Sequence, residues 1–250
     1  MNGLLLPAQR QARAEKKLRA VLRWLRDETW STPEVLGTVM QLNSRQATYK
    51  SLRKLESEGY IASTEMQIFK KKTQLIFGIT SHGLAHAFDL NEPLENRPVF
   101  EPSRVALTTL QHEIDIQLLR VRAECAGWTQ WMPGTRLGAS RPGEKRPDAV
   151  ALSPNQQVVA IEVERTAKTK KRYEALLSQY FQAAARGKYH LIVWVSPTED
   201  FCGRLKRLIG SITAVPVGSK RINLEQRHFD LMQFHSYHTW PNSISKEKDK

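Results

Sequence analysis

Apolar residues three and four positions apart, the spacing of an amphipathic helix, recur along the N-terminal part of the chain. They predict a first helix over 14–27, and the basic residues 1–13 before it are expected to form a loosely held arm. A hydroxyl residue followed by proline predicts a second helix over 33–40. Ser44 is the expected N-cap of a third helix, which Gly59 ends.

The pattern then changes to the apolar alternation of two β-strands within residues 60–80. The turn between them carries three consecutive lysines, Lys70, Lys71 and Lys72. Three helices followed by a hairpin with a cationic tip is the order of a winged helix-turn-helix domain, whose third helix enters the DNA major groove while the wing touches phosphate. The expected DNA-binding face of that helix carries residues at spacings of three and four: Arg45, Gln46, Tyr49, Lys50 and Arg53.

Residues 91–102 hold three prolines and no periodicity, so they are the expected linker after a DNA-binding domain over 1–90. The rest of the pattern predicts the order αβββαβα: a helix over 104–126, strands at 128–132, 149–152 and 158–163, a helix over 170–186, a strand over 189–196 and a helix over 199–209. The expected fold class is α/β, α+β overall, with a mixed sheet in a second domain over 103–241. The basic tail over 242–250 is expected to be disordered.

Two strands of the second domain are predicted to carry acidic residues to one place. Asp148 precedes the first apolar run, Glu162 lies near the end of the returning run, and Glu164 follows it. Because strand side chains alternate, Glu162 and Glu164 point to the same face, and pairing of the strands can bring both near Asp148. Clustered carboxylates repel one another unless a cation neutralises them, and Mg²⁺ prefers such oxygen ligands. The spacing predicts a divalent-metal site; an ordinary solvent-facing hairpin is the alternative.

The charge balance indicates a polyanionic partner. The formal net charge is +13 and the pI is about 9.9, so nucleic acid is the expected partner and a membrane surface is its rival. No apolar run approaches the length of a spanning helix, so we expect a cytoplasmic protein without membrane insertion. The two cysteines, Cys125 and Cys202, have no CxxC neighbour and are expected to be core thiols. His235 and His238 are expected at the surface.

Several motifs carry a resemblance to known families. Pro147-Asp148, a gap of thirteen residues and Glu162-x-Glu164 resemble the signature of the PD-(D/E)xK nuclease superfamily. The ITSHGLAHA segment resembles the end of many winged-helix domains. Over residues 14–196 the chain has an N-terminal winged helix, a helix bearing QHEID, then RPDA, IEVER and a helix ending in Tyr180. In this order it resembles the replication-relaxation family, in particular the MobC type of plasmid mobilisation relaxase. The resemblance implies a restriction-endonuclease-like αβββαβ core. It also implies a protein that recognises an origin of transfer in double-stranded plasmid DNA, with a coupling protein or accessory mobilisation protein as a further partner.

The resemblance also implies roles for particular residues. By position, Asp148 and Glu162 would bind Mg²⁺ or Mn²⁺, and Glu113 on the helix over 104–126 would add a carboxylate. Glu164 stands where the superfamily usually has lysine, and it would act on the attacking water. The lysines that follow at once would replace the missing lysine or grip phosphate: Lys168, Lys170 and Lys171.

The expected reaction is Mg-dependent, site- and strand-specific nicking of DNA. Water is one possible nucleophile, and Tyr173 or Tyr180, on the helix after the acids, is the other, through a phosphotyrosine link. Two further classes of function stay open. One is a DNA-binding replication or transcription regulator with an inactive nuclease-like domain, which the missing lysine supports. The other is a restriction-like endonuclease that makes double-strand cuts.

Overall fold

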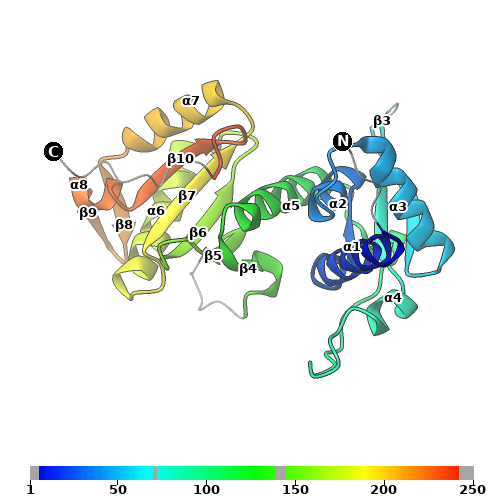
Figure 1. Cartoon of the computed structure of the whole chain (residues 1–250). Helices are drawn as coiled ribbons and strands as arrows, with labels where there is room; N and C mark the ends of the chain where they lie inside the picture. Colours follow the sequence, from blue (N-terminus) through cyan, green and yellow to red (C-terminus); the bar gives the residue numbers. More distant parts are fainter. Residues whose placement is uncertain (1–5, 70–71, 139–144, 242–250) are drawn as a thin grey trace, which may run out of the picture. The chain divides into compact units, whose positions relative to one another are not determined.

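A computed structural model describes residues 6–69, 72–138 and 145–241 (Figure 1). The chain forms two compact units, Met1–Gln117 and Leu118–Lys250, and the division falls within helix α5 (Leu110–Cys125). The linker predicted over 91–102 lies inside the first unit. The predicted disordered tail over 242–250 lies outside the described residues.

The first unit contains the predicted order of three helices and a hairpin, followed by a short helix. Its sheet is antiparallel with the strand order β1-β3-β2. The elements are α1 (Pro7–Glu28), β1 (Trp30–Ser31), α2 (Pro33–Val39), α3 (Arg45–Ser57), β2 (Ile61–Phe69), β3 (Lys72–Ile79) and α4 (Ser81–Ala85). The prediction of a loose arm over 1–13 was wrong from Pro7 onward. Proline fits the first position of a helix, and strong helix formers follow it.

Capping interactions set the limits of α2 and α3. The Thr32 and Ser44 hydroxyls accept the N–H groups of Val35 and Ala47, each at 3.4 Å. Gly59, with φ of +78°, ends α3 in the left-handed region that glycine favours. These limits confirm the two predicted helices.

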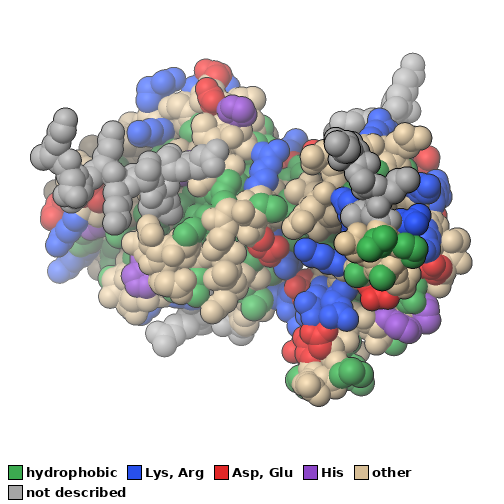
Figure 2. Space-filling model, viewed as in Figure 1, with side chains coloured by type: hydrophobic (Ala, Val, Ile, Leu, Met, Phe, Trp, Pro, Cys, Tyr) green, Lys and Arg blue, Asp and Glu red, His purple; other side chains and the backbone are tan. Residues whose placement is uncertain are grey.

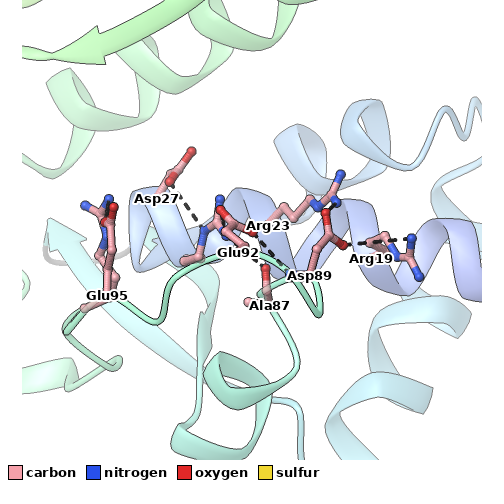
Figure 3. Close-up of polar contacts among 9 residues, drawn as sticks. Arg19, Arg23, Asp27, Ala87, Asp89, Glu92 and Glu95 are labelled. Carbon is pink, nitrogen blue, oxygen red and sulfur yellow. Dashed lines mark hydrogen bonds and ion pairs between the residues drawn. The ribbon is translucent and has the colours of Figure 1, made fainter.

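The segment after α4 is held on the first unit by ion pairs, which Figure 3 shows, and by one close packing contact. Arg23 of α1 forms an ion pair with Asp89, and Arg26 forms one with Glu92 at 2.8 Å. Further along, the ring of Phe100 covers Gly78 so closely that a Cβ on Gly78 would lie 1.9 Å from it. Phe100 thus anchors the proline-rich stretch on β3. This contact explains why the stretch lies inside the first unit.

The second unit is built on a mixed five-stranded sheet with the order β10-β7-β6-β5-β4. Strands β10, β7 and β6 are parallel, whereas β5 and β4 run antiparallel to their neighbours. The strands are β4 (Thr129–Pro133), β5 (Ala149–Leu152), β6 (Val158–Val163), β7 (Leu191–Ser196) and β10 (Met232–Ser236). With α5, α6 (Lys170–Ala185) and α7 (Glu199–Gly210), the strands β4 to β7 confirm the predicted order αβββαβα. Strand β10 comes after this order and was not predicted. The overall class is α+β.

One face of this sheet is covered by α6 and α7. Tyr173 and Leu177 of α6 and Ile209 of α7 belong to the same buried cluster as Ile192 and Trp194 of β7. Every residue of β7 is buried, as its continuous apolar run predicted. On the other face, His235 of β10 packs against Trp240, and the Trp240 indole N–H donates to the carbonyl of Leu119 in α5 at 3.0 Å.

Several expectations about this part of the chain were wrong. Helix α5 begins at Leu110 rather than 104. The residues before it form the short 3-10 helix η1 (Pro102–Arg104) and then a turn over 107–109, and the Thr109 hydroxyl donates to the Glu113 carboxylate at 2.6 Å. Cys125 is exposed in the last turn of α5, and Cys202 is half-buried. His235 is buried, at 8% exposure, by its place in the sheet, whereas His238 is exposed as expected.

The elements after α7 are β8 (Ala214–Val217), β9 (Lys220–Asn223), α8 (Gln226–Phe229) and β10. They are four or five residues long, too short for their pattern to predict them. Within the described ranges, no helix has both the length and the apolar character needed to cross a membrane.

Candidate functional site

Asp148 and Glu162 face each other across the hairpin of β5 and β6. Ala149 lies opposite Ile161 in the antiparallel register, so Asp148, one residue earlier, lies opposite Glu162. The main-chain N–H of Val163 donates to Asp148 Oδ2 at 2.8 Å and fixes that carboxylate at the end of the strand. The hairpin therefore brings the two acids together, as the strand alternation predicted.

The side chain of Glu162 is only 2% exposed and points toward α6. There the Tyr180 hydroxyl donates to its Oε1, and the Lys145 ammonium group lies 3.0 Å from the same oxygen. Burial, followed by the negative charge of Asp148, raises the pKa of Glu162 from its ordinary value of 4.5 to about 7, although Lys145 and Tyr180 act in the opposite direction. Glu162 thus changes charge near neutral pH, where binding of a cation favours the charged form.

Glu164 is equally buried and lies just beyond β6, where its N–H donates to the carbonyl of Val195 at 2.9 Å. Its carboxylate forms an ion pair with Lys168. Burial raises the pKa of Glu164, and the contact with Lys168 opposes that shift. Of the three lysines expected to serve this site, Lys168 is therefore the one placed against an acid. The Lys170 ammonium group donates instead to the carbonyl of Ser211 at 2.8 Å, and Lys171 is exposed.

Lys145 is a site residue that the sequence analysis missed. It lies three positions before Asp148, outside any helix or strand, and it forms an ion pair with Glu162. The sequence feature that could have indicated Lys145 is the basic pair Lys145-Arg146 directly before the Pro147-Asp148 motif. With Lys145 and Lys168, each buried glutamate has one cationic partner.

Both candidate tyrosine nucleophiles are buried in the α6 layer, Tyr173 at 0% and Tyr180 at 1% exposure. The Tyr173 hydroxyl accepts the N–H of Lys168 at 3.2 Å, while Tyr180 donates to Glu162. Burial raises the pKa of Tyr173 to about 12 and raises that of Tyr180 well above its ordinary value. Such phenols resist deprotonation, which counts against either tyrosine as a nucleophile.

The chemistry of the acidic pair fits a hard divalent cation. The described parts of the chain contain no group of three or more His, Cys, Asp or Glu side chains arranged to hold a metal ion. Mg²⁺, however, is commonly bound by one or two carboxylates, with water and substrate phosphate completing its shell. Asp148 and Glu162 form such a pair. Glu113, the third expected ligand, lies on α5 in the first unit, where its carboxylate accepts the Thr109 hydroxyl.

The expected DNA-binding face of α3 is largely open to solvent. Four of its five residues are exposed, namely Arg45, Gln46, Lys50 and Arg53, and Tyr49 is half-buried. Arg45 lies over the Tyr49 ring, 5.5 Å from its centroid, and Arg53 forms an ion pair with Glu56 at 2.8 Å. Figure 2 shows Lys and Arg side chains exposed on this unit.

A groove of about 660 Å³ runs between α2, α3 and the hairpin, with Arg45 and Tyr49 among its lining residues. Glu34 and Glu65 also line the groove, so its lining carries both positive and negative side chains. Lys70 and Lys71 of the predicted wing tip lie outside the described residues, and the side chain of Lys72 is not described either.

One comparison with known proteins gives a match. The model of the replication-relaxation family matches residues 22–191, from within α1 to the start of β7, and so includes α3 and the acidic hairpin. No curated protein and no solved structure matches the chain. Because the matched segment covers more than half of the 250 residues, the chain belongs to the replication-relaxation family.

Proposed function

We propose that this protein is a plasmid mobilisation relaxase of the MobC type, which recognises an origin of transfer in double-stranded DNA and nicks it by metal-dependent phosphodiester cleavage. Membership of the replication-relaxation family supports a DNA-related role in plasmid replication or mobilisation. The observation that carries the nicking activity is the buried Glu162 opposite Asp148, a carboxylate pair whose mutual repulsion a divalent cation would relieve.

In this proposal the second unit is a PD-(D/E)xK-like nuclease domain. Asp148 and Glu162 would hold Mg²⁺ or Mn²⁺. The ion would supply Lewis-acid polarisation of the scissile phosphate. Glu164, held by Lys168, orients or deprotonates the attacking water. Lys145 and Lys168 supply the positive charge that offsets the negative charge developing on the phosphate. Lys170 contributes a further contact to the DNA phosphate.

The first unit would act as a winged-helix DNA reader. Its exposed α3 face offers Arg45, Gln46, Lys50 and Arg53 to base edges. The lysines predicted for the hairpin tip would contact phosphate. A coupling protein or accessory mobilisation protein would take up the nicked complex. This division of work places sequence recognition in one unit and cleavage in the other.

A supercoiled plasmid that carries the origin of transfer tests the proposal. Protein and Mg²⁺ are expected to convert it to open circles. Asp148→Ala and Glu162→Ala should not nick, yet in EDTA they should bind DNA as well as wild type or slightly better, because each removes a negative charge that repels phosphate. Asp200→Ala, which changes an exposed acid on α7, is the matched control and should nick normally. Wild-type nicking by both site variants would refute the metal mechanism.

A second candidate is a DNA-binding regulator with an inactive nuclease-like domain. The observation that favours it is that Glu162 and Glu164 each have a lysine partner, so the site is largely charge-compensated without a metal. Unchanged plasmid together with site-specific binding would identify this function. Linear product would identify a restriction-like endonuclease instead.

A further inference from the structure

Two histidines lie one helical turn apart on the surface of the first unit. His82 and His86 are four positions apart at α4, both are exposed, and their ring centroids are 4.6 Å apart. Histidine side chains are visible together at the surface of this unit, at the position of α4 (Figures 1 and 2). Residues four apart on a helix lie on the same face, so both imidazoles can reach one ligand.

The hydrogen bonding of His86 favours metal coordination. Its Nδ1 lies 2.9 Å from the carbonyl oxygen of His82. Because a carbonyl can only accept, Nδ1 carries the proton and Nε2 of the neutral ring keeps a free lone pair. This is the common arrangement of metal-bound histidines, in which the second ring nitrogen donates to a backbone carbonyl and fixes the tautomer.

Tyr60 restricts the orientation of both rings. It stacks on His82 with centroids 4.8 Å apart and meets His86 edge-on at 5.3 Å. The backbone beneath is also held, because the Thr80 hydroxyl caps Gly83 N–H at 3.0 Å. A Cβ on Gly83 would lie 2.0 Å from the Tyr60 carbonyl oxygen, so α4 is packed directly against the backbone of Tyr60. The two imidazoles are therefore largely preorganised.

We propose that His82 and His86 form a surface binding site for one borderline transition-metal ion, of the class Cu²⁺, Ni²⁺ or Zn²⁺. Imidazole nitrogen suits these ions, whereas Mg²⁺ prefers oxygen. Two protein ligands leave the other coordination positions to water. This site is independent of the proposed nicking activity, since it uses neither the acidic pair nor α3.

Titration of the untagged full-length protein with CuCl₂, NiCl₂ and ZnCl₂, each alone in a non-chelating buffer above neutral pH, tests the site by calorimetry. Cu²⁺ should bind most tightly. His82→Gln and His86→Gln should each weaken Cu²⁺ binding by about a hundredfold or more, because the second imidazole binds an ion already held by the first. His238→Gln is the matched control, since it removes an exposed imidazole outside α4, and it should leave this binding unchanged.

Electron paramagnetic resonance of the wild-type protein with substoichiometric Cu²⁺ is a second measurement that needs no variant. Two imidazole nitrogens in the copper spectrum are expected. One imidazole nitrogen, or equal losses of affinity in His82→Gln, His86→Gln and His238→Gln, would overturn the proposal. So would tight Cu²⁺ binding that survives both of the α4 variants.

Discussion

At the scale of single residues, the most informative side chain is Glu162. Its carboxylate is buried beside another acid and is held by one ammonium and one phenol group. Burial raises its pKa more than these partners lower it, so the pKa lies near 7. The Glu162 carboxyl group therefore changes its charge near neutral pH, and a cation bound beside it would favour the charged form.

This pKa leads to a prediction for stability against pH. In the folded state the pKa of Glu162 is about 7 and its ordinary value is 4.5, so between these values the folded protein binds more protons than the unfolded chain. The contribution of Glu162 to the free energy of unfolding therefore falls as pH rises through this window. Glu162→Gln should remove that fall, so its stability relative to wild type should increase toward pH 7. Urea unfolding in EDTA at several pH values measures the free energy of unfolding of both proteins. A difference between them that does not change with pH would contradict the raised pKa of Glu162.

Glu164 and Lys168 lead to a second prediction, because the lysine stays when the glutamate is removed. If Glu164 acts on the attacking water as proposed and Lys168 shares that role, Glu164→Ala should nick more slowly than wild type but remain active, since Lys168 stays in place. Lys220→Ala, which changes an exposed lysine on β9, is the control and should leave the nicking rate unchanged. Single-turnover nicking in Mg²⁺ gives both rates. A completely inactive Glu164→Ala protein that still binds DNA would show that Lys168 has no compensating role.

At the scale of elements, β7 is the buried centre of the second unit, paired with β6 on one side and β10 on the other. Val193→Asp would place an unpaired charge at a position with 0% exposure and should cost about 3–5 kcal/mol of unfolding free energy. Thr129→Asp on the edge strand β4 is the exposed control and should change stability by about 0.5 kcal/mol or less. Chemical denaturation compares them, and a Val193→Asp protein as stable as wild type would show that β7 tolerates charge.

Helix α3 carries the prediction about sequence recognition. Changing Arg45 and Arg53 to alanine should lower the preference for the origin of transfer over random DNA, by about 1–3 kcal/mol for each arginine that reads a base. Lys54→Ala is the control on the same helix, because Lys54 pairs with Glu58 outside the proposed face. Binding to specific and random duplexes at one salt concentration gives the ratio. A ratio equal to that of wild type would mean that another element reads the DNA.

At the scale of the whole molecule, the net charge of +13 predicts binding to DNA of any sequence that weakens steeply with salt. If the wing lysines bind phosphate, changing Lys70, Lys71 and Lys72 to alanine should reduce the slope of log affinity against log salt by about 0.9 for each phosphate that is no longer neutralised. The preference for the specific site should change little, because phosphate contacts carry no sequence information. An unchanged slope would remove the wing from the interface.

The sequence by itself determined the features that depend on neighbouring residues. The order of helices and strands up to α7 and the cap at Ser44 follow from local periodicity and residue type. The meeting of Asp148 with Glu162 also follows, since a strand pair joined by a short turn has few possible registers. Membership of the replication-relaxation family was likewise visible in the motifs, and the family match confirms it.

Only the tertiary structure decided which residues surround those acids. Lys145 and Tyr180 reach Glu162 from a loop and a helix, and neither interaction leaves a periodic signal in the sequence. The same holds for β10, a short strand that becomes an edge of the sheet only by pairing with β7, and for Phe100, which places the proline-rich stretch inside the first unit. Local spacing fixes secondary structure, whereas burial, charge partners and pKa depend on residues brought together by packing across long separations in the chain.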